Sequence, residues 1–225
     1  MTRSQTFTMY RHINSAFLFT FSNFLYCTHA GISTINTVTY SGNGCAQGTV
    51  YTTKDPHSTI LTQDFEGLFL SWGPGTNPVD HLKTCVININ FGFDEPCNRL
   101  TVNKHGMNAT GFLYRMRENV AIKAIVTYMR ADGVDAVASS TVSWEDLPVD
   151  PISGWLGWQH TSGAPDNTIT TSCSDTTWLR IYYRVTVTTS EEFYHSLIGS
   201  EGPQEGNWSF KHSISVEKCE GCEKG

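Results

Sequence analysis

The sequence has few charged residues and no long uninterrupted hydrophobic run. Of its 225 residues 16% are charged, and 21 acidic residues against 15 basic ones give a formal charge of −6. An acidic chain has no counterion-release drive toward a phosphate backbone, so we expect neither nucleic acid nor an anionic membrane surface as a partner. The most apolar stretch, residues 16–26, is too short for a membrane span, which needs about 20 apolar residues.

Several motifs that mark catalytic or metal sites are also absent. The sequence has no Gly-x-Ser-x-Gly nucleophile elbow, no His-x-x-x-His pair, and no second Cys-x-x-Cys beside the one at residues 219–222. Structural zinc needs four ligands, so this lone motif is interpreted as part of a disulfide framework, with redox or metal use as the alternative. The eight histidines are scattered and are expected to be surface or satisfied core residues. We therefore expect no cofactor.

The first 30 residues contain two arginines, an apolar stretch and no acidic residue. This arrangement is typical of a secretory signal peptide, and Ala30 suits cleavage before Gly31. Cleavage leaves 13 basic and 21 acidic residues, a formal charge of −8, and removes Cys27. We therefore predict a secreted, extracellular protein.

Six cysteines follow residue 30, and an even number in an exported chain is most simply a disulfide framework. Six cysteines allow 15 pairings, and the sequence alone does not choose among them. Sequons at Asn108 and Asn207 fit the same compartment and predict a glycoprotein. The disulfide candidates are Cys45, Cys85, Cys97, Cys173, Cys219 and Cys222.

Apolar and polar residues alternate with a period of two along much of the chain, while helical periodicity is nearly absent. This pattern predicts antiparallel strands, with residues 119–130 and 137–144 forming a hairpin around the turn at 131–133. Gly- and Pro-rich connectors between short strands favour an all-β fold, either an antiparallel β-sandwich or a jelly-roll-like barrel, stabilised by disulfides. Further strands are expected at residues 32–40, 58–65, 84–91, 178–188 and 208–216.

One short helix is expected after the last strand of the main domain. Ser190 suits an N-cap, Phe193 and Leu197 lie four residues apart, and Gly199 suits the stop. The expected organisation is a signal peptide at residues 1–30, a β domain at 31–190, and an extension at 191–225 with the helix, a strand and the Cys-x-x-Cys tail.

Four segments occur in a distinctive order and spacing: Ser41-Gly42-Asn43-Gly44-Cys45, residues 73–89, residues 126–136, and Ser172-Cys173 with residues 178–181. In these segments the chain resembles the DUF4360 family of secreted, cysteine-containing proteins, many of them fungal and most uncharacterised. The resemblance runs from residue 38 to about 189. It implies an exported β-rich domain with Cys45, Cys85 and Cys173 at family positions, and it implies no catalytic residues. Cys97 and the region after residue 190 depart from the family pattern.

Trp155 and Trp158 lie between glycines in the segment 154–160. Exposed indoles there would stack on sugar rings or seat an apolar ligand, and two buried core tryptophans are the alternative.

We expect a secreted protein that acts by binding, as an interaction or effector-like protein, with carbohydrate as one ligand class. Its partner would be an extracellular protein, a glycan or a small apolar ligand. A secreted enzyme acting on cell-wall carbohydrate or a small metabolite is the first alternative, and a structural protein of a wall or spore surface is the second.

Overall fold

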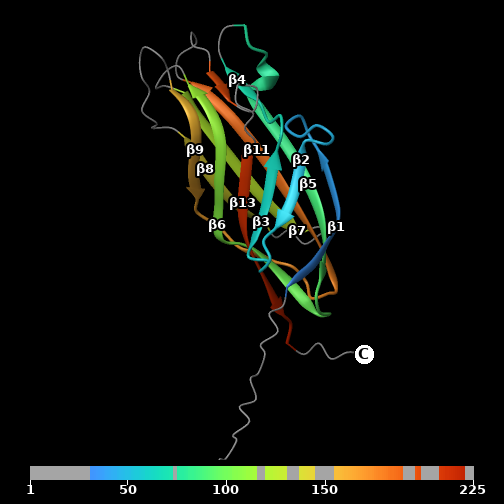
Figure 1. Ribbon diagram of the computed structural model, residues 1–225. Helices are drawn as coiled ribbons and strands as arrows, with labels where there is room; N and C mark the ends of the chain where they lie inside the picture. Colours follow the sequence, from blue (N-terminus) through green and yellow to red (C-terminus); the bar gives the residue numbers. More distant parts are fainter. Residues whose placement is uncertain are drawn as a thin grey trace, which may run out of the picture.

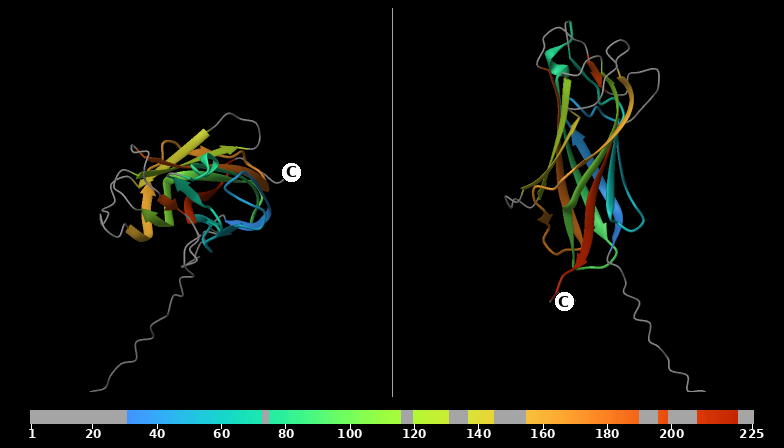
Figure 2. Two further views of the ribbon diagram at one scale, coloured as in Figure 1. Left: turned by 90° about the horizontal axis from the view of Figure 1, so that it is seen from above. Right: turned by 90° about the vertical axis from the view of Figure 1, so that its left-hand side faces the viewer.

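The computed structural model describes residues 31–72, 75–115, 120–130, 137–144, 155–189, 196–198 and 208–220. This described part forms 13 β-strands and one turn of 3-10 helix, η1 (Pro78–Asp80). Figures 1 and 2 show an elongated molecule whose longest strands run roughly along its length. The predicted signal peptide and the predicted turn at 131–133 lie outside the described residues.

One sheet has five strands in the order β1-β5-β11-β7-β8, and all neighbours are antiparallel. The predicted hairpin is confirmed, because the last two strands pair from Ile122 with Trp144 to Met129 with Val137. The five strands are β1 (Ile32–Ser41), β5 (Leu82–Phe93), β7 (Val120–Arg130), β8 (Val137–Trp144) and β11 (Thr176–Thr189).

The other sheet has eight strands and is built around the long strand β6. Strands β13, β12, β10 and β9 all pair with β6, and β3 and β2 follow beyond β13. The members of this sheet are β2 (Val50–Lys54), β3 (Ile60–Phe65), β4 (Leu70–Trp72), β6 (Asn98–Arg115), β9 (Trp155–Gly163), β10 (Ile169–Thr170), β12 (Ser196–Ile198) and β13 (Trp208–Lys218).

The core lies between the two sheets, as expected for a sandwich. On β11 the buried residues alternate with exposed or half-buried ones from Thr177 to Thr188, which matches the predicted period of two. Aromatic rings from both sheets meet in the centre, where the ring of Phe65 lies 4.9 Å from that of Tyr183 and 5.6 Å from that of Phe210. The predicted all-β antiparallel sandwich is therefore confirmed.

Disulfides join the sandwich at two points. Cys45 is bonded to Cys85 and Cys173 to Cys219, with Cα atoms 5.6 and 6.1 Å apart. Cys97 is also disulfide-bonded. The prediction of a disulfide-stabilised fold is confirmed.

The predicted short helix is wrong at residues 196–198, which form β12. The backbone of this segment pairs with β4 on one side and β6 on the other, so its N–H and C=O groups are satisfied within a sheet. The rest of the predicted helix lies outside the described residues. Strand β13, from the stretch expected to be a C-terminal extension, lies between β3 and β6.

Candidate functional site

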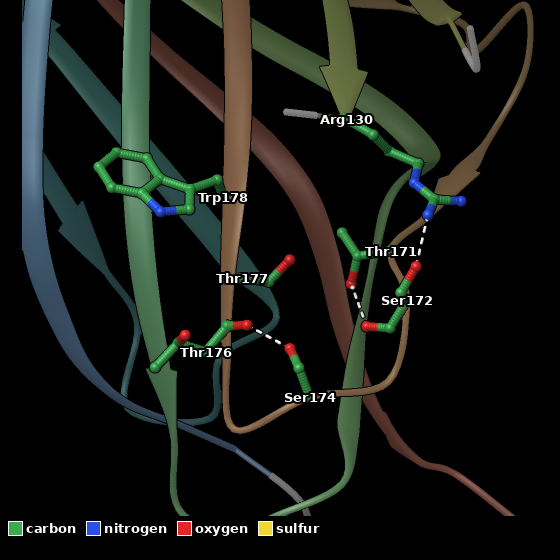
Figure 3. Close-up of a pocket in the computed structure, with 7 residues that line it drawn as sticks. All are labelled: Arg130, Thr171, Ser172, Ser174, Thr176, Thr177 and Trp178. Carbon is green, nitrogen blue, oxygen red and sulfur yellow. Dashed lines mark hydrogen bonds between the residues drawn. The ribbon is translucent and has the colours of Figure 1, made fainter. Parts of the chain in front are cut away.

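A small hollow lies at the start of β11, beside the loop that follows β10. Its volume is about 190 Å³, which is below the roughly 300–1,000 Å³ of pockets that enclose a drug-sized ligand. Figure 3 shows the Trp178 ring projecting from one side of β11, while Thr171, Ser172 and Arg130 lie on the other side. The hollow suits the edge of a larger ligand better than a whole metabolite. It is lined by Arg130, Thr171, Ser172, Ser174, Thr176, Thr177 and Trp178.

The loop that lines the hollow, residues 171–175, is fixed to both sheets. Backbone hydrogen bonds of 2.9 to 3.2 Å join it to β6. Arg130 Nη2, at the end of β7, donates a hydrogen bond to Ser172 Oγ over 2.6 Å. The disulfide between Cys173 and Cys219 ties the same loop to the end of β13. A ligand would therefore meet hydroxyl groups that are already held in place, which limits the entropy lost on binding.

A row of large side chains runs along the outer face of the five-stranded sheet. These side chains belong to β11 and point away from the core, because they alternate with the buried residues of that strand. They are Trp178, Arg180, Tyr182 and Arg184. The side chain of Trp178 is 43% exposed. A single exposed apolar residue is ordinary, but this indole stands beside a hollow and a row of polar groups. Such amphipathic aromatic residues are typical of contact sites.

Two amides on β5 lie beside this row. Asn90 and Asn88 are the cross-strand partners of Trp178 and Arg180. Asn36 Nδ2 donates to Asn90 Oδ1 over 2.8 Å, and Arg180 Nε donates to Asn88 Oδ1 over 2.8 Å. These contacts orient both amides before any ligand arrives. We name the set the β11 face, and it consists of Trp178, Arg180, Tyr182, Arg184, Asn88 and Asn90.

The two tryptophans predicted as stacking residues lie on β9. In the register of the sheet, Trp155 pairs with Arg115 of β6 and Trp158 with Phe112. The side chains of both tryptophans lie outside the described part of the chain. Their role in stacking stays a prediction.

The two predicted glycosylation sites differ in what the structure describes. Asn108 is exposed on β6, and its Oδ1 accepts a hydrogen bond from Ser162 Oγ over 2.6 Å. The Nδ2 atom, to which a glycan would be attached, takes no part in this contact. Asn207 lies outside the described residues, and glycosylation at both positions stays a prediction.

A polar cluster in the core is closed to ligands. His212 on β13 is fully buried, with Nδ1 2.8 Å from the Tyr128 hydroxyl and Nε2 2.6 Å from the Tyr183 hydroxyl. Burial lowers the pKa of His212 to about 3 and raises the pKa of both tyrosines. The uncharged ring donates one of these hydrogen bonds and accepts the other. This histidine is a satisfied core residue, one of the two roles expected for the scattered histidines.

Trp178 is not among the ligand contacts that the sequence predicts. The alternation that predicts the strand at 178–188 assigns Leu179 and Ile181 to the core. It therefore assigns Trp178 to the solvent-exposed face of the strand. An aromatic residue at a position where the pattern demands a polar one is the signal that identifies it.

The described residues offer little for metal or thiol chemistry. No three His, Cys, Asp or Glu side chains among them lie close enough together to hold one metal ion. The Cys219 sulfur is bonded to Cys173 and not to Cys222, the other cysteine of the motif, which lies outside the described part. Across the described ranges, no helix is long and apolar enough to cross a membrane.

Fold and site together define a class: a disulfide-stabilised antiparallel β-sandwich with an exposed aromatic and polar sheet face. The model of the family described as "Domain of unknown function (DUF4360)" matches residues 30–219. The chain belongs to the DUF4360 family, as its sequence resemblance indicates. The match extends past β12 and includes β13.

A fungal relative supports the predicted compartment. An "Uncharacterized secreted protein" of Arthroderma benhamiae is 38% identical over 56 residues, which make up 25% of this chain and 23% of that protein. The alignment thus spans less than a quarter of the relative's length. Disulfides form and persist in oxidising, extracellular environments. The protein is secreted, as the sequence predicts.

The comparison with solved structures includes a sugar-bound protein that aligns with most of the chain. The structure of TmCBM61 in complex with beta-1,4-galactotriose covers 82% of this chain and 90% of its own, at 14% identity and a TM-score of 0.27. A TM-score this low does not relate the binding faces of the two proteins.

Proposed function

We propose that this secreted protein binds carbohydrate through the β11 face. The observation that carries the proposal is the exposed indole of Trp178 beside two amides already oriented by hydrogen bonds. A sugar ring presents an apolar C–H face and a rim of hydroxyl groups. An indole covers the first, while amide, guanidinium and hydroxyl groups hydrogen-bond to the second.

The rigidity of the face also supports binding. The polar groups stand on paired strands, and the hollow beside them is lined by a loop held by the disulfide at Cys173. Sites on such elements keep their geometry better than sites on open loops, and little side-chain freedom is lost when a ligand docks. An open sheet face next to a shallow hollow fits a chain of sugars better than a single enclosed molecule.

The proposal is tested by Trp178→Ala. This variant should bind soluble cell-wall polysaccharides about tenfold or more weakly, because it loses the aromatic side chain that anchors the ligand. Affinity gel electrophoresis and calorimetry with a panel of such polysaccharides measure the change. Tyr51→Ala is the matched control, because Tyr51 is an aromatic residue of similar exposure, 48%, on β2 of the other sheet. The control should bind like the natural protein.

Two results would overturn the proposal. One is that no polysaccharide in the panel is retarded by the natural protein. The other is that Trp178→Ala and Tyr51→Ala reduce affinity equally, since the contact would then not lie on the β11 face.

A further inference from the structure

The five-stranded sheet contains no acidic residue. Strands β1, β5, β7, β8 and β11 include five Lys or Arg and not one Asp or Glu, although the chain has 21 acidic residues in all. The net negative charge of the protein is therefore carried elsewhere, and this sheet is locally basic. The five basic residues are Lys83, Lys123, Arg130, Arg180 and Arg184.

Three of these cations stand exposed on the outer face of the sheet. Arg180, Arg184 and Lys123 are exposed, and no carboxylate of the described residues forms an ion pair with them. Among the described residues, acidic side chains make contacts at the borders of the sheet, where Asp80 pairs with Lys83 and Asp166 accepts a hydrogen bond from Ser139. The centre of the face thus keeps a positive potential that its own residues do not cancel.

The cations alternate with aromatic rings along β11. One face of the strand carries Trp178, Arg180, Tyr182 and Arg184. On the neighbouring strand β7, Lys123 pairs with Thr186 and extends this row. From Trp178 to Arg184 the row covers about 20 Å at roughly 3.3 Å per residue. Rings and charges at this spacing suit an extended polymer that repeats an apolar ring and an anionic group.

We propose that the ligand of the β11 face is an acidic polysaccharide. Its carboxylate or sulfate groups pair with Arg180, Arg184 and Lys123, while its sugar rings pack on Trp178 and Tyr182. This inference rests on the proposed function and narrows it from carbohydrate to anionic carbohydrate. A nucleic acid strand offers rings and anions as well, but the secreted location and the negative charge of the rest of the molecule disfavour it.

The test uses two forms of one polymer. Polygalacturonate and its methyl-esterified form share a backbone, and only the first is charged. The natural protein should bind polygalacturonate about tenfold more tightly than the ester, and only the affinity for polygalacturonate should fall as salt is raised.

Two single variants are then compared, and each removes one positive charge from a different sheet. Arg184→Gln should weaken binding to polygalacturonate about fivefold and weaken binding to the ester less. Lys211→Gln removes one exposed positive charge from β13 in the other sheet, and it should change neither affinity. Trp178→Ala should weaken both.

The outcomes separate the two proposals. Equal affinity for both polymers, or equal effects of Arg184→Gln and Lys211→Gln, would overturn the acidic ligand while the carbohydrate proposal stands. Absence of binding to either polymer and to the neutral panel would overturn both. Tighter binding to a single-stranded oligonucleotide of matched charge than to polygalacturonate would assign the face to nucleic acid and overturn the inference.

Discussion

His212 joins the two sheets through two hydrogen bonds, and burial keeps its imidazole uncharged. The ring lies on β13, and the two tyrosines that contact it lie on β7 and β11 of the other sheet. In the unfolded chain a histidine takes up a proton below about pH 6.5, whereas burial keeps the pKa of His212 near 3. Between these values the unfolded state binds more protons, so stability is lost as pH falls.

Acidification from pH 7 to pH 5 should therefore remove about 2 kcal/mol of folding free energy through this one group. Urea unfolding of the natural protein and of His212→Gln at both pH values measures the effect. The variant should lose less stability between the two pH values by about this amount. His57→Gln is the control, because His57 is exposed and should keep the natural pH dependence. Equal pH dependence in the natural protein and His212→Gln would contradict the prediction.

At the residue scale, only part of the candidate site can be predicted from the sequence. The sequence assigns Trp178 to the wet face of its strand but does not reveal Asn36, which orients the Asn90 amide from 54 residues away. A contact between distant segments depends on strand order and register. The local pattern of apolar and polar residues determines neither the strand order nor the register.

At the scale of elements, β11 and the β7–β8 hairpin are predictable because their alternation is unbroken. β6 is the longest strand, yet the sequence does not predict it. Its buried apolar residues fall on even positions before the irregularity, at Leu100 and Val102, and on odd positions after it, at Met107 and Ala109. The phase changes at an irregularity where Asn103 and Gly106 have positive φ and where the register against β13 shifts. A bulge of this kind breaks the period on which strand prediction rests.

β6 also approaches β13 through a glycine. A Cβ added at Gly111 would lie 2.5 Å from Cδ2 of the Trp208 ring, which is fixed in the core. Gly111→Ala should therefore lower the free energy of unfolding by about 1–3 kcal/mol, the usual range for overpacking. Chemical denaturation measures this loss.

The control for this substitution is Gly48→Ala, where an added Cβ meets nothing within 4 Å and only the φ of +82° is unfavourable. Its cost should be about 1 kcal/mol. If Gly111→Ala proves no more harmful than Gly48→Ala, the ring of Trp208 does not pack against this strand as described.

At the scale of the whole molecule, the average charge conceals how charge is distributed. The formal charge of −6 argues against an anionic partner for the chain as a whole. The fold gathers five basic residues and no acidic one into a single sheet, so one face can attract what the rest of the surface repels. Composition cannot show this, because segregation arises only when strands distant in sequence pair.

The disulfide network is the other property of the whole molecule that can be tested. Cys45–Cys85 and Cys173–Cys219 close loops of 40 and 46 residues, and each should contribute about 4 kcal/mol by restricting the unfolded chain. Cys97 is bonded too, and its carbonyl accepts the backbone N–H of Cys219 over 3.0 Å. Cys222 lies three residues further along the sequence and is the one cysteine after residue 30 left to assign. We predict that Cys97 pairs with Cys222.

Peptide mapping of the secreted protein without reduction should recover these three linked pairs, and thiol titration after denaturation should find no free cysteine. The same digest after reduction is the control and should release all six peptides separately. Two free thiols, or a peptide that joins Cys97 to any other cysteine, would contradict the pairing.

If Cys97 pairs with Cys222, two adjacent disulfides tie the end of β13 to the loop after β5 and to the loop that lines the hollow. The base of the binding face would then be closed by covalent links, and mild reduction should weaken polysaccharide binding before it unfolds the sandwich.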